Sequence, residues 1–263
     1  MPSQHLEFSG SQGRRLAGRL DLPDTTVRGF AVHAHCFTCS KDGLAAFHLG
    51  KALSQAGVAM LRFDFSGLGD SQGRFSDVTF SDWVADYVAA ARCLAEHHGV
   101  PRLLLGHSLG GAIAIAAAQE LPDAAAIATI GAPFEPATVI RQFGEHVELI
   151  RQQGQAQVKL AGRSFTITRA LLEDLEAQRQ EPRVRELRRP LLVLHSPLDA
   201  TVPIEEAGKI FQAALHPKSF VSLDRADHLL TRPTDTQWLA NMICAWVAPY
   251  LEESSAAGDP PRG

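Results

Sequence analysis

The chain has 263 residues, of which 45% are hydrophobic and 21% are charged, and its formal net charge is −4 at pH 7. Acidic and basic residues are interspersed along the chain, so no basic face predicts binding to nucleic acid or to an anionic membrane. Residues 1–8 lack the apolar core of a signal peptide, and no apolar run approaches the ~20 residues of a membrane span. We therefore expect a soluble, cytoplasmic protein with one sizeable core and neither a nucleic-acid nor a membrane partner.

The first half of the chain predicts a hairpin followed by alternating strands and helices. Residues 4–9 and 15–22 alternate between polar and apolar side chains and are separated by Gly10-Ser11-Gln12-Gly13, which is typical of a hairpin. After the hairpin, apolar runs predict strands and helical periodicity predicts helices. The strands are expected at 29–35, 58–63 and 102–105, and the helices at 44–55, about 80–97 and 112–120.

The second half continues this alternation after a long interruption. Strands are expected at 125–130, 190–195 and 219–223, and helices at about 204–215 and 235–250. Strands that alternate with helices at this spacing are typical of right-handed crossovers between parallel strands. The fold class is therefore α/β, with a mostly parallel sheet flanked by helices.

The interruption covers about residues 133–189, which are rich in Arg, Glu and Gln. Within it we expect a helix at 145–153 and a hairpin of residues 158–161 and 164–167 that turns at Gly162-Arg163. Because so many residues are too many for a loop, we interpret the segment as a small cap over the carboxyl edge of the sheet. Residues 1–253 then form one domain with this insertion, and residues 254–263, which are small, polar and rich in Pro and Gly, form a flexible tail or linker.

The sequence Gly106-His107-Ser108-Leu109-Gly110-Gly111 lies between an expected strand and an expected helix. Strand, GxSxG and helix in this order are typical of a nucleophile elbow, in which a sharp turn presents the serine hydroxyl. Such a turn requires small residues beside the serine, which explains Gly106 and Gly110. The pattern predicts that Ser108 is a nucleophile, and the alternative is a glycine-rich turn with an incidental serine.

A serine hydroxyl is a weak nucleophile until a base takes its proton, so the elbow requires a histidine and an acid at the carboxyl ends of later strands. Asp199 follows the strand expected at 190–195, and His228 follows the last strand. The order Ser, Asp, His along the chain is that of the elbow-containing fold. The alternatives are a helix N-cap for Asp199 and a solvated loop histidine for His228.

Acyl transfer also requires backbone N–H groups that point at the developing oxyanion. One donor is expected from Leu109, directly after the nucleophile, and the other from Phe37, in the loop after the strand at 29–35. His33 and His35 alternate on one face of that strand and could form half of a metal site. No third ligand lies nearby in the sequence, so we favour a structural role for both and expect no metal and no organic cofactor.

Several motifs of the chain resemble those of a known family. GHSLGG at 106–111, RFDFSGLGDSQG at 62–73, the turn at Asp199 and ADH at 226–228 resemble the α/β-hydrolase superfamily over nearly the whole chain. HCFTCSK at 35–41 resembles the HGFTGxK segment of cinnamoyl and feruloyl esterases. That resemblance implies that the N–H of Phe37 serves the oxyanion and that a compact cap carries a small hairpin.

A narrower resemblance concerns AHCFTCSKD, RFDFSGLGDS, HPKSFVSLDRADHLLTR and LAGRSFTI. These segments are similar to the hydrolase domain that is often joined to a C-terminal domain of the osmotically inducible protein C (OsmC) type, a family of thiol peroxidases. The 263 residues contain no peroxidase cysteines of that type, so we expect no peroxidase activity from them. The resemblance leaves an OsmC-type redox protein open as a partner, beside a second copy of the chain in a homodimer.

The four cysteines do not suggest a disulfide framework. Cys93 and Cys244 fall within helical patterns, whereas Cys36 and Cys39 replace the two glycines of the esterase loop around Phe37. We favour a packing role for this CxxC pair, because it does not lie at a helix N-terminus that would lower a thiol pKa. A redox-active dithiol is the alternative.

The expected function is a serine hydrolase that cleaves small acyl or aryl esters through Ser108, His228 and Asp199. The cap is expected to close the substrate pocket with apolar side chains, namely Phe143, Leu149, Phe165 and Ile167. Two alternatives remain open: a thioesterase or amidase that uses the same residues, and a non-catalytic partner of an OsmC-type redox protein.

Overall fold

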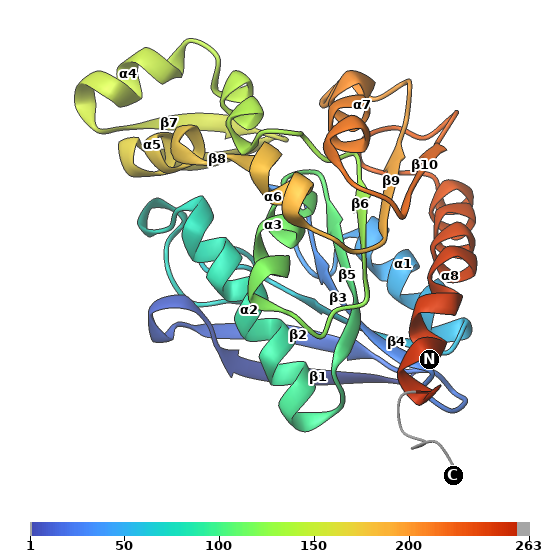
Figure 1. The fold of residues 1–263 in the computed structure, drawn as a ribbon. Coiled ribbons are helices and arrows are strands. Elements are labelled where there is room, and N and C mark those ends of the chain that lie inside the picture. Colours follow the sequence, from blue (N-terminus) through green and yellow to red (C-terminus); the bar gives the residue numbers. More distant parts are fainter. Residues whose placement is uncertain (1, 257–263) are drawn as a thin grey trace.

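Figure 1 shows the fold in a computed structural model, which describes residues 2–256 and the side chains of residues 2–251. An eight-stranded sheet has the order β1-β2-β4-β3-β5-β6-β9-β10. Its strands are β1 (Ser3–Ser9), β2 (Arg15–Asp21), β3 (Gly29–Ala34), β4 (Val58–Phe63), β5 (Pro101–His107), β6 (Ala126–Ile130), β9 (Leu191–His195) and β10 (Lys218–Ser222). β2 pairs antiparallel with β1 and β4, and the remaining neighbours pair parallel. The predicted mostly parallel α/β sheet and its N-terminal hairpin are confirmed.

Helices cover both faces of the sheet. α1 (Leu44–Gln55) and α8 (Pro233–Ala256) pack on one face, and α2 (Phe80–His97), α3 (Leu109–Ala117) and α7 (Ile204–Ala213) pack on the other. Every residue of β4, β6 and β9 is buried, because a strand covered on both sides has no solvated face. Continuous apolar runs therefore identified these strands in the sequence.

The insertion between β6 and β9 contains more structure than the sequence analysis predicted. It consists of the 3-10 segment η4 (Pro136–Phe143), α4 (His146–Gln153), β7 (Gln155–Leu160), β8 (Arg163–Thr168), α5 (Arg169–Ala177) and α6 (Gln180–Glu186). In Figure 1, α4, β7, β8 and α5 form a yellow-green lobe beside the carboxyl ends of the parallel strands. α5 and α6 were not predicted, since both are short and rich in charged residues.

The predicted hairpin of the insertion is present, but its turn lies one residue earlier than expected. Leu160 pairs with Arg163, so the turn residues are Ala161 and Gly162 and Arg163 begins β8. Ala161 has φ +46° and Gly162 has φ +79°. Two successive positive φ angles are typical of the two-residue turn that suits the twist of a hairpin, and this preference fixes the register.

The insertion is anchored to the helices beneath it. The Asp174 carboxylate accepts hydrogen bonds from the backbone N–H and the hydroxyl of Ser81, at 2.7 and 2.8 Å. The Gln180 side chain donates to the backbone carbonyl of Ala112, at 2.8 Å. These bonds join α5 to α2 and α6 to α3.

The C-terminal helix extends further than predicted, because α8 reaches Ala256. Residues 254–256 of the predicted tail thus belong to this helix, and residues 257–263 lie outside the described residues. None of the helices between residues 2 and 256 combines the length and the apolar character that a bilayer span requires.

Candidate active site

Ser108 occupies a sharp turn between β5 and α3. Its backbone has φ +56° and ψ −127°, which a residue with a side chain rarely adopts. A Cβ atom at Gly106 would lie 2.1 Å from the carbonyl oxygen of Gly110, and one at Gly110 would lie 2.4 Å from that of Ala34. Both glycines are therefore required by close backbone approach, as the elbow pattern predicted. β5 continues to His107 and α3 begins at Leu109, so strand and helix meet directly at the serine.

The structure brings Ser108, His228 and Asp199 together from three separate loops. His228 Nε2 lies 3.0 Å from Ser108 Oγ, and His228 Nδ1 lies 2.7 Å from Asp199 Oδ2. With the imidazole proton on Nδ1, the ring donates to the carboxylate and accepts from the serine hydroxyl. This arrangement can remove the hydroxyl proton when the oxygen attacks an electrophile.

The Asp199 carboxylate is held in its ionised form. Its Oδ1 accepts hydrogen bonds from the backbone N–H groups of Thr201 and Val202, at 2.9 and 2.8 Å. Burial acts to raise the pKa of Asp199, but the hydrogen bonds from His228 and from these N–H groups lower it below its ordinary value. The acid is thus fixed in position and charged beside the imidazole.

The sequence predicted two backbone N–H groups as oxyanion donors. Those of Phe37 and Leu109 have no hydrogen-bond partner among the described residues. The Phe37 ring is fixed by edge contacts with Phe75 and Trp83, at 5.6 Å between centroids in both cases. Because the ring is buried in this aromatic cluster, the backbone of Phe37 has little freedom to move.

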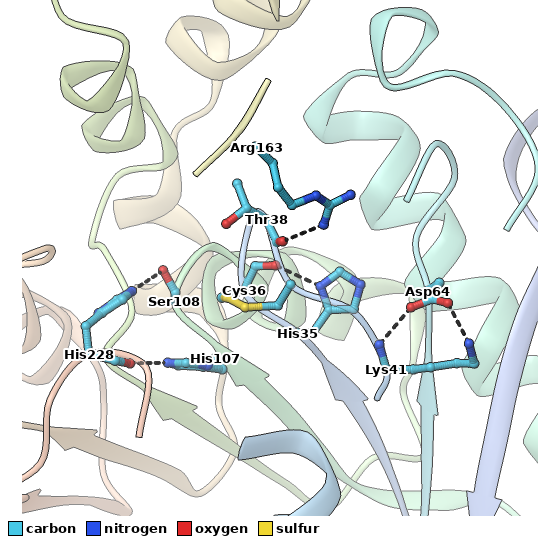
Figure 2. The surroundings of a disulfide bond; sticks show 10 residues. His35, Cys36, Thr38, Lys41, Asp64, His107, Ser108, Arg163 and His228 are labelled. Carbon is cyan, nitrogen blue, oxygen red and sulfur yellow. Dashed lines mark hydrogen bonds and ion pairs between the residues drawn. A yellow bond between two sulfur atoms is a disulfide. The ribbon is translucent and has the colours of Figure 1, made fainter. Parts of the chain in front are cut away.

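The loop that carries Phe37 contains a disulfide bond between Cys36 and Cys39. Figure 2 shows it next to Ser108. The Cys39 N–H donates to the Cys36 carbonyl at 3.1 Å, so a tight turn brings the two Cα atoms to 5.2 Å, within the range that a disulfide needs. The sequence analysis expected two separate packed cysteines here, and the structure corrects that expectation. Cys93 and Cys244 are free.

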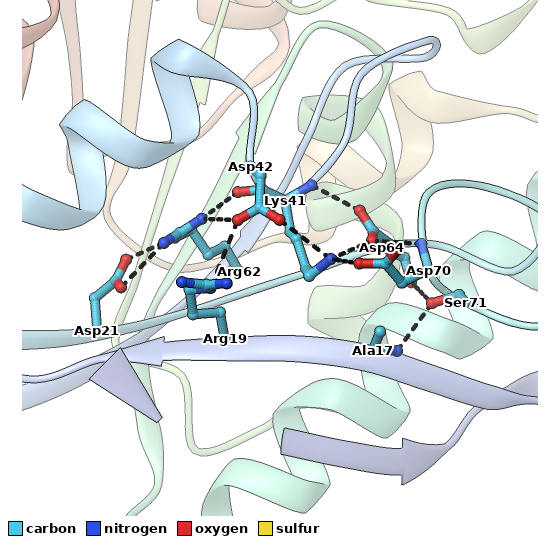
Figure 3. Close-up of polar contacts among 9 residues, drawn as sticks. All are labelled: Ala17, Arg19, Asp21, Lys41, Asp42, Arg62, Asp64, Asp70 and Ser71. Carbon is cyan, nitrogen blue, oxygen red and sulfur yellow. Dashed lines mark hydrogen bonds and ion pairs between the residues drawn. The ribbon is translucent and has the colours of Figure 1, made fainter. Parts of the chain in front are cut away.

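The same loop is held from below by a network of buried charges (Figure 3). The Asp64 carboxylate accepts from the Lys41 backbone N–H at 2.7 Å and from Lys41 Nζ at 2.8 Å. Arg62 donates to the Lys41 carbonyl at 2.6 Å and to Asp21 at 2.7 Å. Burial acts to lower the pKa of Lys41, but its hydrogen bonds to Asp64 and Asp70 raise it above the ordinary value, so the ammonium stays charged.

Asp64 also bonds the backbone beyond Lys41. Its carboxylate accepts from the backbone N–H groups of Lys41 and Asp70, whereas the Asp70 carboxylate accepts from Lys41 Nζ. Arg62 was missed. An arginine inside the apolar strand β4 is the signal that could have revealed it, because a buried guanidinium needs acidic partners.

The imidazoles of His33, His35 and His107 are buried near Ser108. His35 Nδ1 bonds the Cys36 carbonyl, and His107 Nε2 bonds the His228 carbonyl, both at 2.7 Å. Burial lowers the pKa of all three, and that of His107 falls to about 4. Within residues 2–251, no three His, Cys, Asp or Glu side chains are grouped so that they could hold a metal ion.

The four predicted substrate-binding residues do not line the cavity at Ser108. Phe143, Phe165 and Ile167 are buried, and their rings and methyl groups pack within the insertion and against Phe37 and Phe75 rather than facing open space. Leu149 is exposed on the outer side of α4. The narrow cavity beside Ser108 is lined instead by Leu109, Pro133, Thr138, Val139, Gln142, Thr201 and Val202.

Known proteins share this fold and parts of this sequence. A family model described as serine aminopeptidase, S33, matches residues 38–166, a stretch that contains Ser108 but ends before Asp199. The crystal structure of the esterase domain of a Rhodothermus marinus protein is 45% identical, with a TM-score of 0.78, and the match covers 95% of this chain and all of that domain.

Two further matches are more distant. The structure of Est1E from Butyrivibrio proteoclasticus with ferulic acid bound has a TM-score of 0.80 at 21% identity, covering 93% of this chain and 98% of that one, which supports the fold alone. The palmitoyl-protein thioesterase ABHD10 of Mus musculus is 25% identical over 77% of this chain and 70% of its own length. The matches cover between 34% and 75% of the length of the curated relatives. For most of these relatives the chain spans about half of their length.

Proposed function

The chain belongs to the α/β-hydrolase superfamily of serine hydrolases, and on this premise we propose that it is a carboxylesterase for small acyl or aryl esters. The observation that supports the proposal is the unbroken chain of hydrogen bonds from Ser108 through His228 to Asp199, at 3.0 and 2.7 Å. The N–H groups of Phe37 and Leu109, which have no partner among the described residues, are the proposed oxyanion donors. Nucleophile, base, orienting acid and oxyanion donors are the parts that acyl transfer requires.

In the proposed reaction, Ser108 Oγ attacks the ester carbonyl carbon while His228 Nε2 takes the hydroxyl proton. The carbonyl oxygen becomes an oxyanion and accepts hydrogen bonds from the N–H groups of Phe37 and Leu109. His228 then gives its proton to the oxygen of the leaving alcohol, the bond between carbonyl carbon and that oxygen breaks, and an acyl-enzyme remains. Water, activated by His228, attacks the acyl-enzyme and releases the acid. Asp199 orients the ring and stabilises its charged form throughout.

A test combines covalent labelling with replacement of the nucleophile. Wild-type protein should react with a fluorophosphonate at Ser108 and hydrolyse p-nitrophenyl acetate, and Ser108→Ala should lose labelling and at least about 10⁴-fold in kcat. Ser54→Ala, which removes another buried hydroxyl on α1, is the matched control and should keep both activities. Turnover that persists in Ser108→Ala, with an unchanged melting temperature, would refute the assignment.

The second candidate is a thioesterase that uses the same residues. The similarity to a palmitoyl-protein thioesterase supports it, as the match to the serine aminopeptidase family model supports the amidase alternative. Rates with an ester and a thioester of the same acyl group distinguish the two, because only the leaving atom differs. A chain that neither labels nor hydrolyses any of these compounds would leave the non-catalytic alternative.

We propose that residues 133–189 act as a cap, since η4 supplies Thr138, Val139 and Gln142 to the cavity at Ser108. Light scattering of the purified chain, alone and with an OsmC-type protein, tests the proposed homodimer and the proposed redox partner. Fractionation of cells tests the cytoplasmic location.

A further inference from the structure

A second cavity adjoins the candidate active site. It has a volume of about 210 Å³ and lies between the carboxyl end of β3, the first turn of α1 and the loop after His228. The residues that the argument uses are Leu44 and Ala45 of α1, Leu229 of the loop, and three histidines, His33, His35 and His107. The disulfide between Cys36 and Cys39 forms part of the same wall.

The wall of this cavity is continuous with the reacting groups. His107 directly precedes Ser108, and Leu229 directly follows His228. The bond from His107 Nε2 to the His228 carbonyl ties the two segments together at 2.7 Å (Figure 2). The chain neighbours of Ser108 and His228 therefore line this cavity. The other cavity at Ser108 is narrower and lies under η4.

The lining favours an uncharged, apolar occupant. None of the described residues that line the cavity is Asp, Glu, Lys or Arg. Its three histidines are neutral near pH 7, because burial lowers the pKa of each. At the mouth, the side chains of Leu44 and Leu229 are 64% and 47% exposed, so an entering group meets apolar surface first. A charged group would lose its hydration without gaining a partner.

The volume limits the size of the occupant. An engineered apolar cavity of about 150 Å³ in another protein is known to hold benzene. A cavity of about 210 Å³ can therefore take one substituted aromatic ring or a short alkyl chain, but not a long one.

We propose that this second cavity binds the leaving alcohol of the ester, and that this alcohol carries an uncharged apolar group about the size of one aromatic ring. The inference rests on the proposed esterase function. In that reaction the alcohol oxygen takes its proton from His228, so the leaving group lies on the His228 side of the scissile bond.

The first test varies the alcohol while the acyl group stays acetyl. From methyl through ethyl and butyl to benzyl acetate, kcat/KM should rise by about fourfold for each buried methylene until the cavity is full. 3,3-Dimethylbutyl acetate and acetylcholine have nearly the same shape, but only the second is charged. The neutral ester should be hydrolysed at least about tenfold more efficiently, and equal efficiencies would overturn the inference.

The second test narrows the cavity. Ala45→Phe places a ring in it from a partly exposed position on α1, and Ala89→Phe makes the same change on α2, away from Ser108. The ratio of kcat/KM for benzyl acetate to that for methyl acetate should fall at least about tenfold in Ala45→Phe and stay constant in Ala89→Phe. A constant ratio in Ala45→Phe, or a change confined to a series of methyl esters with varied acyl groups, would overturn the inference.

Labelling with a fluorophosphonate separates the two levels of failure. If Ser108 is labelled and acetate esters are hydrolysed without regard to the alcohol, the esterase proposal stands and the alcohol site is refuted. If Ser108 is not labelled and no ester is hydrolysed, both fail together.

Discussion

Three buried histidines surround the candidate active site without belonging to the hydrogen-bonded chain of Ser108, His228 and Asp199. Burial excludes their charged forms, so all three act as neutral walls, and His35 and His107 also donate to backbone carbonyls. His107 matters most, because it holds the carbonyl of His228, the residue that is proposed to transfer protons. Because these histidines stay neutral in the folded protein, the unfolded chain binds more protons in acid, and the folded state loses stability there.

We predict that the protein loses stability between pH 6.5 and about pH 4, and that His107 accounts for a measurable part of the loss. Its pKa falls from 6.5 to about 4 on folding, so the unfolded state binds more protons in this window and the free energy of unfolding decreases as the pH is lowered. A shift of this size corresponds to about 3 kcal/mol. His107→Gln keeps a donor for the His228 carbonyl but does not titrate.

Urea denaturation at pH 7 and at pH 4.5 measures the effect. The decrease between the two pH values should be smaller in His107→Gln than in wild type, while the exposed His97→Gln should behave as wild type. Equal decreases in all three proteins would show that His107 is not neutral in the folded state.

At the residue scale, the sequence predicted the groups that a local pattern fixes. Gly106, Ser108 and Gly110 belong to one short turn, and the turn alone requires them. The distances between Ser108, His228 and Asp199 needed the fold, although their positions after successive strands indicated that they would meet. The lining of the substrate cavities could not be predicted, because an apolar residue such as Phe165 looks the same in a sequence whether it packs in a core or faces a cavity.

At the scale of elements, the loop from Cys36 to Asp42 is held by long-range contacts rather than by its own turn. Lys41 is 3% exposed and Asp64 is fully buried, and each satisfies the other. Arg163 of the insertion reaches the Thr38 carbonyl at 3.4 Å, so the insertion also contacts the loop. The N–H of Phe37 is thereby positioned by groups that never touch the substrate.

We predict that Lys41→Met destabilises the protein by about 3–5 kcal/mol, because it leaves the buried carboxylate of Asp64 without its partner. The kcat for p-nitrophenyl acetate should fall as well, since the Phe37 loop loses its anchor. Urea denaturation and steady-state kinetics measure the two effects. Lys209→Met breaks an ion pair whose lysine is 55% exposed and should cost about 1 kcal/mol or less. Similar costs for the two variants would contradict a structural role for the buried pair.

The disulfide adds a second restraint on the same loop. Replacing both cysteines, in Cys36→Ala with Cys39→Ala, should reduce stability by about 2 kcal/mol, the entropy of closing so short a loop. The kcat/KM should stay within about tenfold of wild type, because the bonds of Lys41 still hold the turn. Cys93→Ala, which removes a free thiol on α2, is the control.

The redox alternative predicts a different result for the same loop. If reduction by dithiothreitol switched the esterase activity of wild type off or on by much more than tenfold, reversibly and with loss of the Cys36 to Cys39 bridge in mass spectra, the disulfide would be a control element. The double variant, which cannot form the bridge, should then have the activity of the reduced wild type and no longer respond to the reductant.

The elements that the sequence predicted well are those with one dominant signal. Strands buried on both faces appear as apolar runs, and α2 appears as a long stretch of helical periodicity. The buried charges could not be paired from sequence, because the pairing of β2 with β4 brings Asp21 close to Arg62, and the loop after β3 brings Lys41 to them.

At the scale of the whole molecule, the sheet separates two apolar cores, and the insertion shares one of them. Val158 and Ile167 of the hairpin belong to the same cluster as Trp83 of α2 and Ile127 of β6. The other cluster contains Leu49 of α1 and the residues of α8. An insertion with a core of its own would unfold independently, whereas this one contributes to the packing over Phe37.

We therefore predict that the insertion and both cores unfold in one cooperative transition. The three tryptophans report separate places, because Trp83 lies under the insertion whereas Trp238 and Trp246 lie on α8 across the sheet. During unfolding in urea, the tryptophan fluorescence of Trp83→Phe should report only on α8. The fluorescence of the double variant, Trp238→Phe with Trp246→Phe, should report only on the face that carries the insertion. Within each variant, the unfolding curve followed by tryptophan fluorescence should coincide with the curve followed by circular dichroism. If the fluorescence of Trp83 changed at lower urea than the dichroism did, the insertion would open before the sheet, and access to Ser108 would then depend on a local unfolding equilibrium rather than on a fixed cavity.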